Sequence, residues 1–160
     1  MFFNKFPLTS FKLDPKTNIL VTDIIRAVKV DPYLKNSDIF YYTYTAKDGE
    51  TPEIISHKAY KSTQYHWVIM LINEKFDAWN DFPQPDIVIQ RMAVDKYSSL
   101  TAVHHWEDSN GNQVDELSGG IPITNIEYER QQNELKRTIK ILKPELLTEF
   151  VSRYQELVSV

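Results

Sequence analysis

The chain has 160 residues, of which 42% are apolar, 12% aromatic and 25% charged. This composition excludes a disordered chain or a collagen-like repeat, and the length is sufficient to bury a sizeable core. Lys and Arg total 18 against 22 Asp and Glu, which gives a formal net charge of −4. Because a nucleic-acid backbone is held by an excess of basic residues, we expect no nucleic-acid partner.

The sequence contains no cysteine, so disulfides, thiolate nucleophiles and sulfur-ligated metals are excluded together. The first residues include aromatics but lack the charged leader and apolar run of a secretory signal. The longest nearly uncharged apolar run, residues 67–72, is far shorter than the ~20 residues that span a bilayer. We therefore expect neither a secreted protein nor a membrane partner.

The N-terminal segment, residues 1–37, contains prolines at a spacing that rules out one long helix or strand. Thr22 and Asp23 are suited to cap a short helix at the apolar residues 24–25. We interpret the segment as an extended arm that carries a turn or two of helix.

The next segment predicts a strand followed by two helices. Residues 39–45 are β-branched or aromatic, and Gly49 follows where a tight turn requires positive φ. A threonine followed by a proline is typical of a helix start, and the apolar spacing predicts a helix over 52–60. A second helix, capped by a serine, is predicted over 62–73 and is apolar around most of its circumference.

A surface helix, a hairpin and a link are predicted after an aromatic loop. The helix covers residues 85–97, and a strand follows at 100–107. The Asn-Gly pair at 110–111 favours a two-residue type I′ turn before a return strand at 113–115. The glycines and proline of residues 118–122 predict a flexible link.

The C-terminal segment predicts a helix, a strand and a second helix. Thr124 and Glu127 form a capping box, which starts a polar helix over 125–136. Residues 137–142 alternate as in a strand, and a strongly amphipathic helix follows. Because the polar helix offers little for this amphipathic helix to pack against, we expect its apolar stripe to lack a partner within the chain.

These elements predict an α+β protein with four segments. They are an N-terminal arm (1–37), a small β-α-α core (38–80), a region of helix, hairpin and link (81–122), and a C-terminal helix-strand-helix extension (123–160).

No catalytic, cofactor-binding or metal-binding residue is predicted. His57 and His66 fall on different helices, and His104 and His105 should point to opposite faces of one strand, so no metal geometry results. The glycine patterns of phosphate-binding loops and the serine elbow of hydrolases are missing from the sequence. Carboxylates beside the hairpin turn, at 107–108, are expected to be solvated. An enzyme is therefore not supported.

Aromatic residues outside regular elements, together with the final apolar stripe, are the candidate interaction surface. Such side chains are typical of protein interfaces, although they equally serve to close a core. The candidate interface residues are Phe2, Phe3, Phe6, Phe76, Trp79, Phe82, Leu147, Phe150, Tyr154 and Leu157.

Several of these motifs resemble a known family. Tyr42, Tyr44 and the runs at 48–55, 59–60 and 67–73 resemble the strand-turn-helix-helix opening of a LysM module. More widely, three motifs in one order resemble the small LysM-like baseplate wedge protein of contractile-tailed bacteriophages. They are Tyr65–Ile69, the hairpin Val103–Asp108 and the segment Asn133–Glu145.

The resemblance implies a structural subunit of the virion tail baseplate, assembled in the host cytoplasm, with a LysM-like core at 38–80. It implies that the chain clamps other wedge proteins and helps to join wedges around the central hub. Its partners would be wedge and hub proteins, in a hetero-oligomer with several copies per virion. No enzymatic activity or cofactor is implied.

The alternative is a LysM-type module that binds peptidoglycan or chitin-like chains. Its groove would use Gly49, Glu50, Thr51 and Asn73, with Trp79 as a stacking platform. Sugar-binding LysM modules close with a short second strand directly after the second helix, whereas here Asn73 leads into a polar and aromatic segment. A hydrolase without a readable motif is the third alternative.

Overall fold

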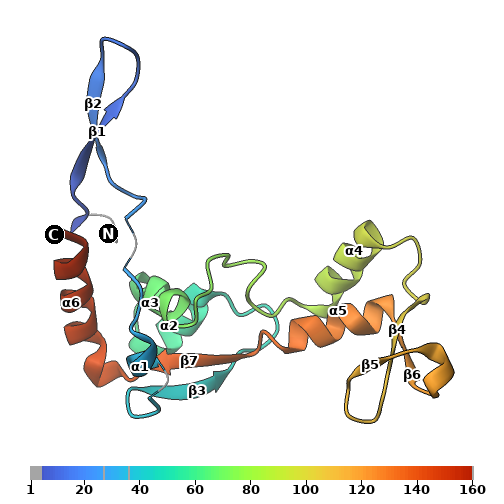
Figure 1. Ribbon diagram of the computed structural model, residues 1–160. Helices are drawn as coiled ribbons and strands as arrows, with labels where there is room; N and C mark the ends of the chain where they lie inside the picture. Colours follow the sequence, from blue (N-terminus) through green and yellow to red (C-terminus); the bar gives the residue numbers. More distant parts are fainter. Residues whose placement is uncertain (1–4, 27, 36, 160) are drawn as a thin grey trace. The chain divides into compact units, whose positions relative to one another are not determined.

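The computed structural model describes residues 5–26, 28–35 and 37–159 (Figure 1). The chain divides into two compact units. Unit 1 contains Met1–Thr43, Pro52–Phe76 and Lys140–Val160, and unit 2 contains Tyr44–Thr51 and Asp77–Ile139. Helices and small antiparallel sheets occur together, which confirms the α+β class.

Unit 1 begins with a hairpin of β1 (Leu8–Lys12) and β2 (Asn18–Thr22). The strands are antiparallel, with a register that runs from Leu8 opposite Thr22 to Lys12 opposite Asn18. In the turn, the carboxylate of Asp14 accepts hydrogen bonds from the amides of Lys16 and Thr17.

The helix predicted at residues 24–25 is therefore wrong, and the hairpin was not predicted. These residues lie in a turn that follows β2, and a short helix, α1, occurs later at Pro32–Lys35. The cross-strand pair Phe11 and Ile19 explains the difference, because aromatic and β-branched residues stabilise each other when they lie opposite on a pleated surface.

The predicted strand and two helices of the next segment are confirmed. They are β3 (Tyr41–Thr45), α2 (Pro52–Tyr60) and α3 (His66–Ile72), the last preceded by a 3-10 turn, η2 (Thr63–Tyr65). The side chain of Ser62 accepts a hydrogen bond from the Gln64 amide and so caps this turn as predicted.

Strand β3 pairs with β7 (Thr138–Leu142), which comes much later in the chain. The Ala46 amide donates to the Arg137 carbonyl at 2.9 Å, and the Lys143 amide donates to the Phe40 carbonyl at 3.0 Å. Because the pairing moves backward along β7 as it moves forward along β3, the two strands are antiparallel. A second strand therefore does pair with β3, although it does not follow α3 directly.

The chain ends with the 3-10 turn η4 (Pro144–Leu146) and the helix α6 (Leu147–Ser159), which packs inside unit 1. Leu147 joins a buried cluster with Val68 and Ile72 of α3, and Tyr154 and Val158 form a second cluster with Phe6. The expectation that the apolar stripe of α6 lacks an internal partner is thus wrong for most of its length.

Unit 2 contains two helices and a three-stranded sheet. The helices are α4 (Asp86–Lys96) and α5 (Asn125–Glu134), and the strands are β4 (Val103–Glu107), β5 (Gln113–Val114) and β6 (Ile121–Thr124), in the order β5-β4-β6. The link predicted at 118–122 is shorter in the structure, because Ser118 ends the 3-10 turn η3 (Glu116–Ser118) and residues 121–122 already belong to β6. The predicted capping box at the start of α5 is confirmed.

The turn between β4 and β5 is one residue longer than predicted. The Asp108 amide donates to the Asn112 carbonyl at 2.9 Å, and the Gly111 amide donates to the Asp108 carbonyl at 3.0 Å. Gly111 has φ of +79°, whereas Asn110 does not have the positive φ that a type I′ turn requires. The loop is therefore a three-residue loop with glycine in the left-handed position.

Candidate functional site

Within the described ranges, no three His, Cys, Asp or Glu side chains are placed to hold a metal ion. Over the same residues, no helix combines the length and apolar character that a membrane span requires. The side-chain clusters and exposed surfaces of each unit are therefore the candidates for function.

In unit 2, His104 and His105 lie together and not on opposite faces of β4. Their Nδ1 atoms are 2.9 Å apart, and His105 Nε2 lies 2.9 Å from Glu107 Oε1. The pairing of β4 with β6 shifts register between Val103 and His105, and such a bulge redirects a side chain. The sequence predictions of divergent histidines and of a solvated Glu107 carboxylate are both wrong for this reason.

The rings of both histidines take part in local contacts. The His104 ring stacks on Tyr128 of α5, with centroids 3.9 Å apart and planes inclined by 9°. Both ring nitrogens of His105 have partners, His104 on one side and Glu107 on the other. We interpret the cluster as a contact that holds β4 against α5.

Charged side chains also connect α4 to α5. Lys96 Nζ and the Tyr97 hydroxyl donate to Glu129 Oε1, at 2.6 and 2.7 Å. Burial alone would raise the pKa of the Glu129 carboxyl, but these two hydrogen bonds and the charge of Lys96 act against it, and the pKa is lowered. Arg130 forms a two-pronged contact with the carboxylate of Asp86.

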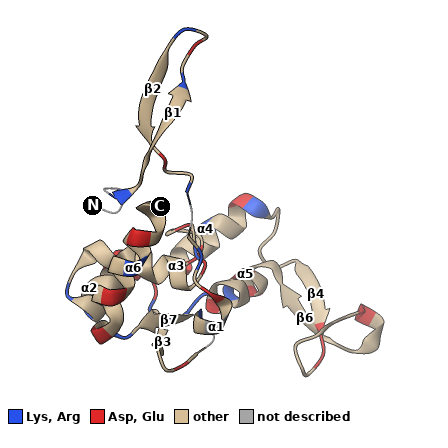
Figure 2. Cartoon of the chain, turned by 60° about the vertical axis from the view of Figure 1, so that its left-hand side comes forward, with Lys and Arg blue, Asp and Glu red and all other residues tan. Residues whose placement is uncertain are grey.

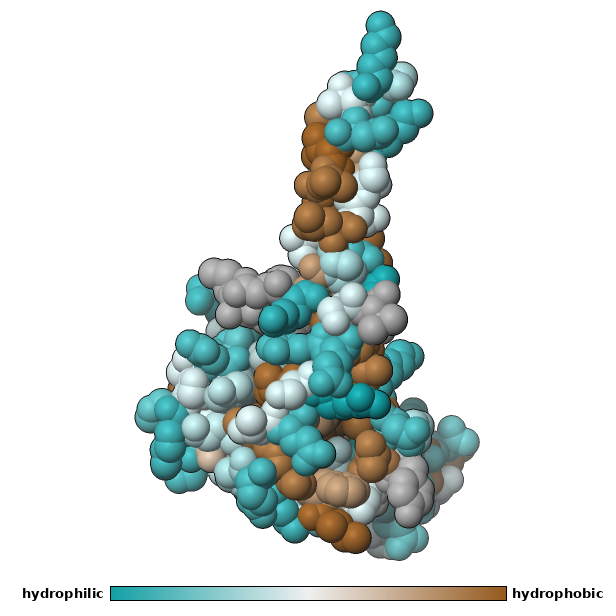
Figure 3. Space-filling view, turned by 90° about the vertical axis from the view of Figure 1, so that its left-hand side faces the viewer, coloured by the Kyte–Doolittle hydropathy of each residue, from teal (hydrophilic) through white to brown (hydrophobic). Residues whose placement is uncertain are grey.

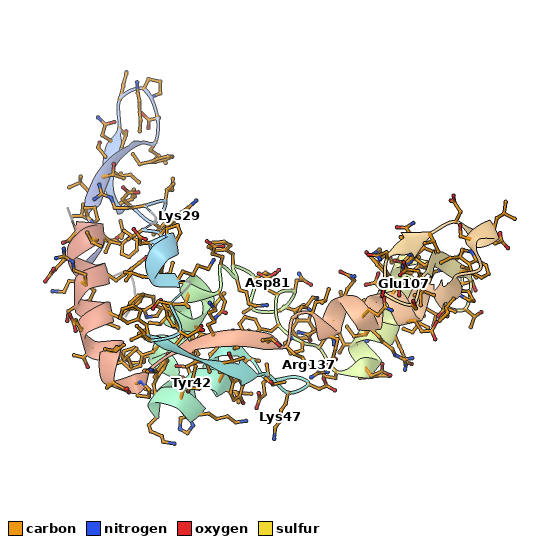
Figure 4. The ribbon with its side chains drawn as sticks, turned by 60° about the horizontal axis from the view of Figure 1, so that its bottom comes forward. Lys29, Tyr42, Lys47, Asp81, Glu107 and Arg137 are labelled. Carbon is orange, nitrogen blue, oxygen red and sulfur yellow. The ribbon has the colours of Figure 1, made fainter. Side chains whose placement is uncertain are left out.

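Arg137, at the entry to β7, is a second charged centre of unit 2. Its guanidinium donates to the carboxylates of Glu134 and Asp48 and to the carbonyl of Ala46. Figure 4 shows Arg137 beside the loop that carries Lys47. Because these contacts join the end of α5 to the loop that follows β3, we interpret the centre as structural.

A group of exposed apolar side chains of unit 1 lies on the hairpin. We call it the hairpin surface, and it consists of Leu8, Phe11, Leu13, Ile19 and Leu20. Leu8 is 64% exposed and Leu20 71% exposed. Figure 3 shows the apolar atoms along the hairpin below a hydrophilic tip. Sequence reasoning missed this surface, although β-branched and aromatic residues flanking an Asp-Pro turn were a usable signal.

The predicted interface residues differ in how deeply they are buried. Phe6, Leu147 and Tyr154 are buried in unit 1, and Phe82 is buried in unit 2. Phe150 is half-buried, while Phe76, Trp79 and Leu157 are exposed. Phe2 and Phe3 lie outside the described residues. The structure brings Phe6 and Tyr154 into one cluster, and Phe150 packs beside Leu147 in another.

Phe76 is 80% exposed and borders an apolar groove of about 230 Å³ in unit 1. Phe6, Val28, Trp67 and Leu71 are among the residues that line this groove. Phe76 therefore shares this groove with two other predicted interface residues, Phe6 and Tyr154, and of these three it is the exposed one.

The residues predicted to bind glycans are largely engaged in the fold. The buried carboxylate of Glu50 accepts from the Tyr44 hydroxyl at 2.8 Å and from the Lys47 amide at 2.9 Å. The side chain of Asn73 donates to the Ile69 and Lys140 carbonyls and accepts from the Lys140 amide.

The other three glycan candidates belong to unit 2. Gly49 adopts the left-handed backbone predicted for it, with φ of +73°. Thr51 and Trp79 are exposed, Trp79 by 57%. Trp79 is thus the aromatic platform that remains accessible in this set.

One family model matches the chain. Its description is base plate wedge protein 53, a phage family, and the match covers residues 1–119. The matched region runs from the N-terminus through the hairpin surface and α4 to the 3-10 turn η3. A comparison with curated proteins finds no match.

Proposed function

This chain belongs to the phage family of base plate wedge protein 53, and we propose that it holds neighbouring wedge proteins together through protein interfaces. The observation that carries the proposal is the set of large apolar side chains left exposed in a folded chain. Large apolar side chains that a folded chain leaves exposed in groups are typical of interaction sites.

The exposed apolar side chains lie on different parts of the molecule. The hairpin surface contributes aliphatic side chains, Phe76 and Leu157 come from the body of unit 1, and Trp79 comes from a loop of unit 2. Aromatic side chains are enriched in the buried centres of interfaces, which supports roles for Phe76 and Trp79 as anchors. A subunit with anchors on several elements is suited to contact more than one partner.

We propose other wedge proteins and the hub as the partners, in a hetero-oligomer present in several copies per virion. Assembly would take place in the host cytoplasm, and the mature location would be the tail baseplate. The role proposed is structural and not enzymatic. The His105–Glu107 and Arg137–Asp48 contacts support it, because these side chains bind one another within unit 2.

Co-expression of the full chain with the other wedge proteins of the same phage tests the proposal. Phe76→Ala, Trp79→Ala and Leu157→Ala should leave the thermal unfolding temperature nearly unchanged, because these side chains are exposed. At least one of them should lower incorporation into the wedge complex by tenfold or more, as an interface anchor does. The matched control is Leu117→Ala, which removes an exposed leucine outside the proposed anchors.

Two outcomes would contradict the proposal. One is a wild-type chain that folds but joins no baseplate component. The other is full incorporation of all three variants, since this would show that the exposed side chains do not contribute to assembly.

Glycan binding is the second candidate, and the pairing of β3 with β7 is the observation that favours it. This pairing provides a sheet beside α2 and α3, as a LysM-like module requires. The hydrogen bonds of Glu50 and Asn73 count against it. Addition of N-acetylglucosamine oligomers should shift the amide resonances of residues 49–51 if glycans bind there, and unchanged resonances would exclude it.

A further inference from the structure

The two ends of the hairpin establish which of its backbone groups face outward. The Leu13 amide donates to the Thr17 carbonyl at 3.0 Å, and the Asp23 amide donates to the Pro7 carbonyl at 2.8 Å. In an antiparallel pair, hydrogen-bonded residues alternate with residues whose N–H and C=O point away. The outward groups of β1 therefore belong to the other alternate set, which is Leu8, Ser10 and Lys12.

The two edges of the hairpin are not equivalent. Along β2 the outward residues are Asn18, Leu20 and Thr22, but the Thr22 carbonyl already accepts a hydrogen bond from the Ile24 amide at 2.9 Å. Every residue of β1 is exposed, whereas β2 becomes half-buried at its end. Among the described strands no third strand joins this sheet. The edge of β1 is thus the longer open edge.

Both faces of the hairpin also carry apolar side chains without a covering layer. Phe11 lies opposite Ile19 on one face, and Leu8 and Leu20 lie on the other. A two-stranded hairpin is marginally stable in water, and a third strand extends both faces and adds backbone hydrogen bonds. An unpaired edge of this kind is a template for strand addition from another chain.

The charge of the hairpin indicates the charge that a partner strand would carry. Residues 5–26 carry four basic and two acidic side chains, a net charge of +2 in a chain of net charge −4. Lys12, on β1, and Lys16, in the turn, have no ion-pair partner in the described part of the chain. Figure 2 shows the charged residues at the ends of the hairpin, with the middle of its strands uncharged.

We propose that the edge of β1 binds an extended segment of another baseplate protein as a third strand of this sheet. The segment has apolar residues beside Leu8 and Phe11 and an acidic residue that faces Lys12. This inference rests on the proposed function and adds the mode of binding. Main-chain hydrogen bonds to Leu8, Ser10 and Lys12 supply the affinity, and the side chains supply the selection of partner.

Two proline substitutions separate this mode of binding from a general effect on the hairpin. Ser10→Pro removes an outward amide of β1, and Asn18→Pro removes an outward amide of β2, so neither removes a hydrogen bond inside the hairpin. We expect Ser10→Pro to lower incorporation of the full chain into the wedge complex by at least tenfold. Asn18→Pro should leave incorporation within twofold of the wild type.

Hydrogen exchange on the assembled complex provides a direct readout. Relative to the free chain, the amides of Leu8, Ser10 and Lys12 should exchange at least tenfold more slowly after assembly. Lys12→Glu should weaken incorporation, and Lys12→Arg should retain it, because the proposed partner contributes an acid.

The outcomes distinguish this inference from the proposed function. If the wild type joins the complex while Ser10→Pro joins it equally well and the β1 amides stay fast, strand addition is overturned and the structural role stands. Equal losses for Ser10→Pro and Asn18→Pro would also overturn it, because the effect would not be specific to the β1 edge. A wild-type chain that joins nothing contradicts the proposed function itself.

Discussion

Asn133 is buried on α5 and binds both backbone groups of one residue. Its Oδ1 accepts from the Gln84 amide at 2.8 Å, and its Nδ2 donates to the Gln84 carbonyl at 3.1 Å. Gln84 is itself buried, so its backbone groups cannot form hydrogen bonds with water instead. One side chain thereby fixes the loop that precedes α4.

We expect Asn133→Ala to destabilise unit 2, because it leaves two buried backbone groups without partners. Each unsatisfied group costs about 1–3 kcal/mol, so the free energy of unfolding should fall by a comparable or larger amount. Denaturant titration measures the change. Gln131→Ala, at an exposed position of the same helix, is the control and should change it by less than about 0.5 kcal/mol. Equal effects of the two variants would contradict this role of Asn133.

At the residue scale, the sequence predicts what depends on neighbours in the chain. The Thr124–Glu127 capping box and the positive φ of Gly49 were predictable because both are local requirements. The contact between His104 and His105 was not, because it depends on a register shift against β6 that no local rule indicates. The partner of Asn133 was also unpredictable, because Gln84 lies 49 residues away in the chain.

At the scale of elements, the packing of α4 on α5 depends on ionisation of Glu129. Its carboxyl has a lowered pKa in the folded chain and an ordinary pKa of about 4.3 when unfolded. A lowered pKa of a carboxyl stabilises the fold above the unfolded value, and this contribution is lost as the pH falls through the folded pKa.

We therefore expect a pH-dependent difference between the wild type and Glu129→Gln. The difference in the free energy of unfolding should stay constant from pH 7 to about pH 5 and shrink below about pH 4.3. Unfolding titrations across this range measure it. Lys96→Met removes one of the two donors, so the folded pKa of Glu129 should be lowered less. The pH range over which this contribution to stability is lost should then be narrower. A difference that persists undiminished at pH 3 would contradict the role of this contact.

The elements themselves were predictable to unequal degrees. The helix α2 has the predicted bounds, since its cap, its proline and its apolar spacing agree. The strands β1 and β2 were missed because the proline spacing rules out one long element but carries no signal for two short strands that pair with each other. The strand β6 was missed because its Ile-Pro pair suggests a link, whereas proline is tolerated on a sheet edge.

At the scale of the whole molecule, the chain crosses between units more than once. Residues 73–137 separate α3 from β7, yet β7 supplies the strand that pairs with β3. The sequence predicted each strand but not their pairing, since periodicity carries no information about partners distant in the chain. The internal packing of α6 was missed for the same reason.

The exposed apolar side chains predict how the isolated chain behaves in solution. With Leu8, Leu20 and Phe76 exposed, the chain should self-associate as its concentration rises, and co-expression with wedge proteins should suppress this by covering the same surface. Light scattering over a concentration series measures the effect.

The double substitution Leu8→Lys and Leu20→Lys tests which surface is responsible. Both residues lie on one face of the hairpin and are exposed, so the change should leave the unfolding temperature within a few degrees of the wild type. Self-association should fall because the new charges repel, and incorporation into the wedge complex should fall with it. If the wild type stays monomeric at high concentration and the variant assembles normally, the hairpin surface is not an interface, because neither copies of the chain nor its partners would be using it.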